Sequence, residues 1–312
     1  MKILFDTDIG SDIDDALALL LLLRLPDIEL VGVTTVYGDT ATRAKVAKKI
    51  LDAADCSAPV FMGCGEPLGS PMPIWHAGTE GDGALSPEER EMPIDGFGIE
   101  QDAPGFIMDM IHQHGRELTV VCLGALTNVA TALRRDPTLA ARMGPLLFMG
   151  GGITFRGPVP DRLEPDGLYK ADPSHNVRCD TVAAQEVFSS GVPMTILTND
   201  VTTRVWWDGE PVRRLMQASH PPEKMLVGNL LRVWLDYRSR IFKRPVTGTC
   251  PHDPLTVAEA VKPRFVRYVR GKMDIWETAA SVFTLDESGP HRAGIHVDAN
   301  DFLVWFSEML GV

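Results

Sequence analysis

Short apolar runs alternate with segments of helical periodicity along the first two thirds of this 312-residue chain. A short run that is apolar at nearly every position is typical of a strand buried on both faces of a parallel sheet. Helices between such strands supply the right-handed crossovers that parallel pairing requires. The pattern predicts an α/β fold with an open, mostly parallel, Rossmann-like sheet and helices on both faces. The predicted strands cover residues 2–5, 30–37, 118–123, 146–150 and 194–198, and the predicted helices cover residues 15–24, 40–54, 103–113, 127–134 and 181–188.

Two stretches interrupt this alternation. Residues 63–102 and 151–176 are rich in glycine and proline and show little periodicity. Loops longer than ~15 residues within a compact domain usually carry function. Both stretches follow predicted strands, so we expect them to project from the carboxyl edge of the sheet.

The C-terminal third has a more helical pattern. Helices are expected at residues 225–241, 254–261 and 302–310. In the first of these, Trp234 and Tyr237 share the apolar stripe, which favours a place in the core over a place in a binding site. No polar linker or repeat divides the sequence, so we expect a single domain over residues 1–312.

The composition excludes several classes of partner. Thirty Lys and Arg against 42 Asp and Glu give a net charge of −12, which disfavours nucleic acid because phosphate binding needs clustered cations. The longest apolar run, residues 16–23, is far shorter than the ~20 residues of a membrane span, so no membrane is expected. Five cysteines without a CxxC pair are typical of free thiols in a reducing compartment. With no recognisable secretory signal, we expect a cytoplasmic protein.

A cluster of aspartates follows the first predicted strand. Asp6, Asp8, Asp12, Asp14 and Asp15 fall within ten residues. One or two of them would be ordinary at a helix N-terminus, where the helix dipole favours negative charge. Five carboxylates at a partly shielded site repel one another, and a hard divalent cation with oxygen ligands offsets that repulsion. The cluster therefore predicts a metal site.

Polar groups also follow other predicted strands. Asp39, the backbone at Leu123 and Asn199 lie at strand ends, which share one edge of a parallel sheet. Asp253, which precedes a predicted helix, could reach the same edge, although its simplest role is an N-cap before Pro254. We expect the ligand crevice at this edge.

These motifs resemble the inosine-uridine preferring nucleoside hydrolase family, and the resemblance spans nearly the whole chain. A lone Asp-x-Asp would be a weak match, but here several motifs occur in the family's order. The matching segments are DTDIGSDIDDA from Asp6, VTTVYGD ending at Asp39, LGALTNVA from Leu123, MGG from Met149, HNVRCD from His175 and HDPL from His252.

The resemblance implies a calcium-dependent hydrolase that cleaves the N-glycosidic bond of a small-molecule ribonucleoside to free base and ribose. Ca²⁺ would be bound by the carboxylates of Asp8, Asp15 and Asp253 and by the backbone carbonyl of Leu123. Water activated by the metal would attack C1′ through an oxocarbenium-like transition state. Asp8 would act as general base, and His252 would protonate the departing base.

The resemblance also suggests how the substrate is held. Asp14, Asp39 and Asn176 would bind ribose hydroxyls, and His76, in a glycine-rich loop, would overlie the base. Because the loop after Gly10 is two residues longer than the family's shortest form, either Asp12 or Asp14 could meet the ribose, and we favour Asp14. By analogy with the family, we expect a homodimer or homotetramer.

Alternatives remain open at this point. Asp39 stands where many family members have Asn, and Ser174 where well-known members have Glu, so a non-catalytic nucleoside- or calcium-binding descendant is conceivable. A haloacid dehalogenase-type phosphohydrolase also begins with a strand and Asp-x-Asp, but Gly10 and the Asp14–Asp15 pair do not fit its motif. His252 could be a hydrogen-bonded structural histidine, and His76 an exposed surface one. The preferred nucleobase is not predicted.

Overall fold

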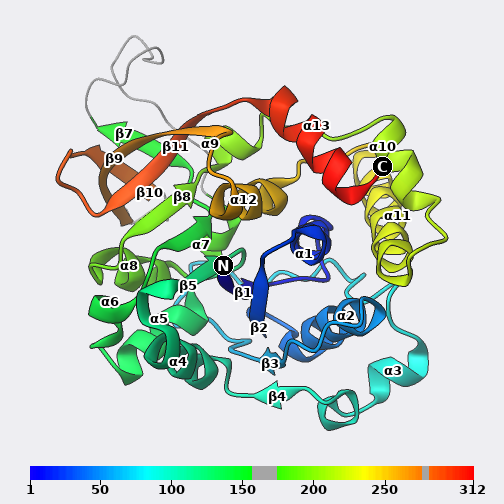
Figure 1. Cartoon of the computed structure of the whole chain (residues 1–312), viewed down its shortest axis with the longest axis horizontal. Coiled ribbons are helices and arrows are strands. Elements are labelled where there is room, and N and C mark those ends of the chain that lie inside the picture. Colours follow the sequence, from blue (N-terminus) through cyan, green and yellow to red (C-terminus); the bar gives the residue numbers. More distant parts are fainter. Residues whose placement is uncertain (157–173, 276–280) are drawn as a thin grey trace.

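The computed structural model describes residues 1–156, 174–275 and 281–312. Within them one eleven-stranded sheet has the order β4-β3-β2-β1-β5-β6-β8-β11-β9-β10-β7 (Figure 1). Every pairing is parallel except the two made by β9, so the predicted mostly parallel α/β fold is confirmed. The strands are β1 (Lys2–Thr7), β2 (Glu29–Thr35), β3 (Val60–Met62), β4 (Glu100–Gln101), β5 (Leu118–Cys122), β6 (Leu146–Met149), β7 (Ile153–Arg156), β8 (Met194–Leu197), β9 (Val266–Ile275), β10 (Ser281–Leu285) and β11 (His291–Val297).

The helices form two layers, one on each face of the sheet (Figure 1). Helices α1, α2, α11, α12 and α13 lie on one side of the sheet and share one apolar cluster with it, and α11 and α13 pack onto α1. Helices α4, α5, α6 and α8 pack against the other face through a second cluster. The helices are α1 (Asp14–Arg24), α2 (Thr40–Ala53), α3 (Pro87–Glu91), α4 (Ala103–His114), α5 (Thr127–Arg135), α6 (Leu139–Arg142), α7 (His175–Cys179), α8 (Thr181–Ser189), α9 (Asn199–Thr202), α10 (Glu210–Met216), α11 (Pro222–Phe242), α12 (His252–Val261) and α13 (Ala299–Leu310).

The central strands are those that the apolar runs predicted. In β5, β6 and β8 every residue is buried, because helices cover both faces of the sheet at these positions. β1 is also buried after its first residue. These four strands form the middle of the sheet and determine where their loops emerge.

Three strands of the C-terminal third were not predicted. β9, β10 and β11 follow the helical part of that third, and β9 runs antiparallel to both of its neighbours. Exposed and buried positions are mixed along β9, and charged residues interrupt its sequence. It therefore lacks the continuous apolar run by which the central strands were recognised.

Of the two long stretches that interrupt the predicted alternation, only residues 63–102 are described throughout. Residues 63–102 contain α3, a 3₁₀ turn at Ile94–Phe97 and the short edge strand β4. Most of the predicted 151–176 loop lies outside the described residues, apart from β7 and the start of α7.

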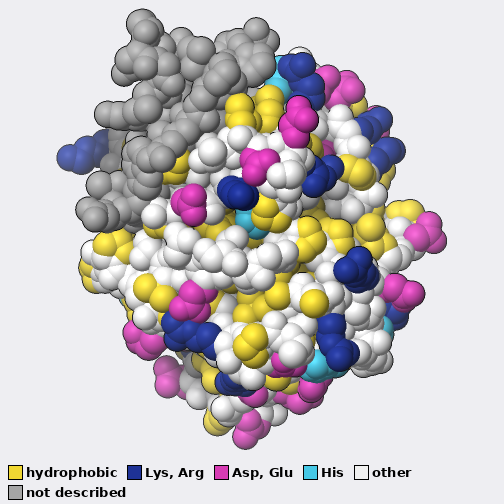
Figure 2. All heavy atoms as spheres, turned by 90° about the vertical axis from the view of Figure 1, so that its left-hand side faces the viewer, with side chains coloured by type: hydrophobic (Ala, Val, Ile, Leu, Met, Phe, Trp, Pro, Cys, Tyr) yellow, Lys and Arg dark blue, Asp and Glu magenta, His cyan; other side chains and the backbone are white. Residues whose placement is uncertain are grey.

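In the described part of the chain, no helix combines the length and apolar character that crossing a bilayer requires. On the face shown in Figure 2, acidic and basic side chains are interspersed among apolar ones. Among the described residues visible on that face, basic side chains form no continuous patch.

Candidate active site

The site lies where the order of strands along the sheet reverses. β1 pairs with β2 on one side and with β5 on the other, and ligands of open α/β sheets bind at the carboxyl end of such a switch point. A pocket of about 450 Å³ opens there, a volume suited to a small-molecule ligand. Its lining comes from the ends of β1, β5, β6 and β8, the starts of α1, α7 and α12, and the second half of α11.

A buried arginine supports the acidic loop that follows β1. Arg43 of α2 is 1% exposed, and its Nε donates to the carbonyl oxygen of Tyr37 at 2.7 Å. Its Nη1 donates to the carbonyls of Asp8 and Ile9 and to Oγ of Ser11. The guanidinium therefore fixes the backbone of the loop and places a permanent positive charge beneath its carboxylates.

Three carboxylates from two helices converge in the pocket. Asp14 and Asp15 begin α1, Asp253 lies in the first turn of α12, and one oxygen of each lies within 4.8 Å of the others. All three are at most 5% exposed. Burial, and then repulsion by neighbouring aspartates, raises the pKa of each carboxyl well above its usual range.

This cluster has the chemistry of a site for a hard cation. Thr7 donates its hydroxyl to Asp15, but no lysine or arginine in the described residues forms an ion pair with the three carboxylates. Buried carboxylates without a countercharge are costly, and a divalent ion with oxygen ligands offsets that cost. The residues present therefore fit a metal of the calcium or magnesium type.

Asp8 and Leu123 line the same pocket. The turn after β5 needs a glycine, because a Cβ at Gly124 would lie 2.7 Å from Val36 and 3.1 Å from Asp8. The carbonyl of Leu123 accepts a hydrogen bond from Nδ2 of Asn176, which also donates to the carbonyl of Met149 at 2.9 Å. The structure thus brings Asp8, Leu123 and Asn176 together with the three carboxylates.

The simplest role predicted for Asp253 is the N-cap of α12, but the structure shows a different start for this helix. The helix begins at His252, its N-cap is Pro251, and no side chain caps it, so Asp253 is not the N-cap. Its carboxylate remains available to the cluster. Nδ1 of His252 lies 2.7 Å from Oγ1 of Thr202. Burial, and to a lesser degree the charge of Arg238, lowers the pKa of His252 to about 4.

Two residues assigned to the substrate do not line this pocket. Asp39 is exposed and caps α2: its Oδ1 accepts from the amide of Thr42 at 3.0 Å, and its Oδ2 accepts from the Thr42 hydroxyl at 2.6 Å. His76 is also exposed and outside the lining. Asp12 and Asp14 both line the pocket, but only Asp14 belongs to the group of three carboxylates.

The apolar stripe predicts Trp234 and Tyr237 in the core and not in a binding site, but both rings also line the pocket. Their rings stack with centroids 5.5 Å apart. Across the pocket, Trp75 and His175 meet edge to face at 5.7 Å. The helical spacing of Trp234 and Tyr237 is the same for a core stripe and for a binding wall, so it contained no signal that separates the two roles.

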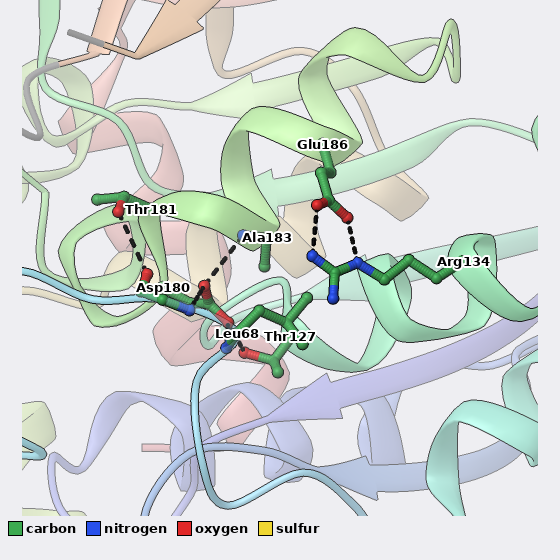
Figure 3. Close-up of polar contacts among 8 residues, drawn as sticks. Leu68, Thr127, Arg134, Asp180, Thr181, Ala183 and Glu186 are labelled. Carbon is green, nitrogen blue, oxygen red and sulfur yellow. Dashed lines mark hydrogen bonds and ion pairs between the residues drawn. The ribbon is translucent and has the colours of Figure 1, made fainter. Parts of the chain in front are cut away.

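Asp180 connects three segments of the chain through hydrogen bonds to its carboxylate (Figure 3). Its carboxylate caps α8 through the amide of Ala183 at 3.0 Å. It also accepts from the amide of Leu68 at 2.7 Å and from the hydroxyl of Thr127 at 2.8 Å. One buried carboxylate thus joins the loop after β3 to the starts of α5 and α8.

Asp6 lies beneath the pocket and not in its lining. Its Oδ1 accepts from the hydroxyl of Thr34 at 2.6 Å and from Nδ2 of Asn128 at 2.7 Å. Burial raises the pKa of this carboxyl to about 7. These contacts hold the ends of β1, β2 and the start of α5 in register below the site.

Comparison with known proteins identifies the relatives of this chain. The family model described as inosine-uridine preferring nucleoside hydrolase matches residues 3–303. Uridine nucleosidase 1 of Arabidopsis thaliana is 27% identical over 278 residues, which cover 86% of this chain and 76% of that protein. The inosine-uridine preferring nucleoside hydrolase of Crithidia fasciculata is 29% identical over 284 residues, covering 88% and 83%.

The fold is similar to that of a solved plant nucleoside hydrolase, with a TM-score of 0.80 at 24% identity over 99% of this chain and 98% of that one. The match to the family model excludes the phosphohydrolase alternative, because it spans nearly all of the chain, acidic loop included. The chain belongs to the inosine-uridine preferring nucleoside hydrolase family and is an N-glycosidase that acts on ribonucleosides.

Proposed function

We propose that this N-glycosidase cleaves its ribonucleosides in the pocket at the carboxyl edge of the sheet, and that the reaction depends on Ca²⁺. The observation that carries the proposal is the convergence of Asp14, Asp15 and Asp253, buried and without a cationic partner among the described residues. A neutral ribonucleoside alone would not stabilise three neighbouring carboxylates, whereas a divalent cation would.

The residues that would hold the ion are Asp8, Asp15 and Asp253 through carboxylates and Leu123 through its carbonyl. All four line the same pocket. Calcium in this position would supply Lewis-acid polarisation of water and of vicinal hydroxyls. The donor set contains only oxygen atoms, which favours calcium over the softer transition metals.

The chain's own side chains provide the remaining chemistry. Asp8 is assigned as the general base that takes a proton from the water attacking C1′. Breaking the C1′–N bond places positive charge on the ribose ring, and the surrounding carboxylates stabilise that charge. Asp14 and the Oδ1 of Asn176 are assigned to ribose hydroxyls, since the Asn176 amide nitrogen already donates to two carbonyls.

His252 is assigned to the departing base. With its pKa lowered to about 4, the imidazole is neutral near pH 7. If the Thr202 hydroxyl donates to Nδ1, the proton of the neutral ring is on Nε2, from which it can donate a hydrogen bond to the departing base. Asp39 and His76 remain predictions from the family resemblance, without support from the pocket lining.

The proposal is tested by measuring ribose release from inosine, uridine, adenosine and cytidine, with calcium and with EDTA. We expect turnover that EDTA abolishes, and we expect Asp15→Asn to lose both turnover and bound calcium, measured by equilibrium dialysis. The matched control is Asp236→Asn on the exposed face of α11. A full equivalent of calcium retained by Asp15→Asn would contradict the metal site, and nucleoside binding without turnover would indicate a non-catalytic descendant.

We also propose that the protein acts in the cytoplasm, in nucleoside salvage, as a homodimer or homotetramer. The five free cysteines support a reducing compartment. The assembly state and the salvage role rest on family analogy alone. Light scattering of the purified protein measures the assembly state.

A further inference from the structure

Arg238 is a pocket residue that the assignments above do not use. It belongs to α11 and lines the pocket beside Trp234 and Tyr237. Its guanidinium carbon lies 5.2 Å from the ring centroid of Trp234 and 4.5 Å from that of Phe242. These two rings hold the guanidinium by cation–π contacts on a helix wall, so its position is determined before a ligand arrives.

No carboxylate in the described part of the chain forms an ion pair with Arg238. Its five donors are therefore not committed to a structural ion pair, although the pocket below is rich in aspartate. The other two arginines of α11 lie outside this pocket. Arg232 donates to Oδ1 of Asn229 at 2.9 Å.

Arg238 and His252 line the same pocket. The helix wall that carries Arg238 also carries Trp234 and Tyr237, whose rings line that pocket as well. Because His252 is the residue assigned to the departing base, the guanidinium shares the pocket with the region in which the base would lie.

Cleavage creates negative charge in that region. As the C1′–N bond breaks, its electron pair moves onto the base nitrogen, while the water oxygen bonds to C1′ and gives a proton to Asp8. Until a proton reaches the base, the base is an anion. A guanidinium remains protonated at every practical pH and, being already in place, stabilises that anion without reorganisation.

We propose that Arg238 is a catalytic residue that contacts the nucleobase and offsets the negative charge that develops on it as the C1′–N bond breaks. This inference rests on the proposed function, because it places the base between α11 and His252. It divides leaving-group activation between a hydrogen bond from His252 and a fixed charge from Arg238.

The test compares two substrates whose leaving groups differ in how much their negative charge must be stabilised by the enzyme. Uridine releases uracil, whose anion is a poor leaving group, whereas p-nitrophenyl riboside releases a p-nitrophenolate, which is a stable anion. For Arg238→Met and Arg238→Gln we expect kcat on uridine to fall by ~10²-fold or more, the range for removing one electrostatic stabiliser, and kcat on p-nitrophenyl riboside to fall much less. Arg238→Lys should recover part of the uridine activity, and the matched control Arg240→Met should leave both substrates unchanged.

The outcomes separate this inference from the proposed function. Equal losses on both substrates, or a rise in KM for uridine with kcat unchanged, would overturn the role of Arg238 and leave the hydrolase intact. A wild-type protein that turns over neither substrate would overturn the proposed function and this inference with it. The calcium-induced rise in Tm should be the same in the Arg238 variants as in the wild type, and its loss would show that the substitution acts through the structure of the site.

Discussion

Asp8, in the loop after β1, and Asp15, in the first turn of α1, are positioned in different ways. The backbone of Asp8 is fixed by Arg43, which donates to its carbonyl and to that of Ile9. Asp15 is held through its side chain, which accepts the Thr7 hydroxyl. A substitution of the Asp8 side chain therefore leaves these backbone hydrogen bonds in place. Its effect on kcat can then be attributed to the loss of the carboxylate.

Asp8→Ala is expected to lower kcat by at least ~10²-fold, because the attacking water loses the group that accepts its proton. Steady-state kinetics on uridine with saturating calcium measure the effect, and circular dichroism checks the fold. Asp236→Ala, on the exposed face of α11, serves as the control. A loss of less than 10-fold would assign the general base to another carboxylate.

Residue patterns alone placed part of the pocket lining together and missed the rest. Asp8 and Leu123 could be placed together because the ends of parallel strands share one edge, whereas Asn176 was assigned only through the family resemblance. Trp234 and Tyr237 could not, since their spacing on α11 serves the core and the pocket equally.

At the scale of elements, burial on both faces decided which strands were predictable. β5 and β8 are buried throughout, because helices cover both sides, and all but one residue of each strand is apolar. β9 mixes charged and apolar residues and exposed and buried positions, so it has no continuous apolar run that would have predicted it.

Asp39, at the N-terminus of α2, has two candidate roles: helix cap and ribose ligand. In the structure its carboxylate caps the helix through Thr42, whereas the family resemblance assigns it to ribose. Asp39→Ala is expected to lower the free energy of unfolding by about 1 kcal/mol, as for loss of an N-cap, and to leave the KM for uridine unchanged. Denaturant unfolding and steady-state kinetics measure the two effects.

Asp39→Asn is the matched control, because asparagine is an equally good N-cap and should retain wild-type stability. A 10-fold rise in KM for Asp39→Ala without loss of stability would instead favour the ribose contact.

At the scale of the whole molecule, the packing of α1 against α12 couples the stability of the fold to metal binding and to the protonation of three carboxyl groups. Their contact places Asp14, Asp15 and Asp253 together, and burial raises the pKa of each carboxyl. In the metal-free protein these carboxyls keep protons that the unfolded chain, with carboxyl pKa values near 4, has released. Their contribution to stability is therefore present at low pH and is lost as the pH rises through the raised pKa values.

Calcium must displace these protons, so its binding should strengthen as the pH rises. We expect the increase in Tm caused by a fixed calcium concentration, relative to EDTA, to grow from about pH 5.5 to about pH 8. Histidines of the unfolded chain titrate in this range, but they affect both samples equally and cancel in the difference. Asp15→Asn should lose most of the increase at every pH. An increase in Tm that is the same across the range would show that the cation does not compete with protons, and would therefore place it away from the carboxylates of α1 and α12.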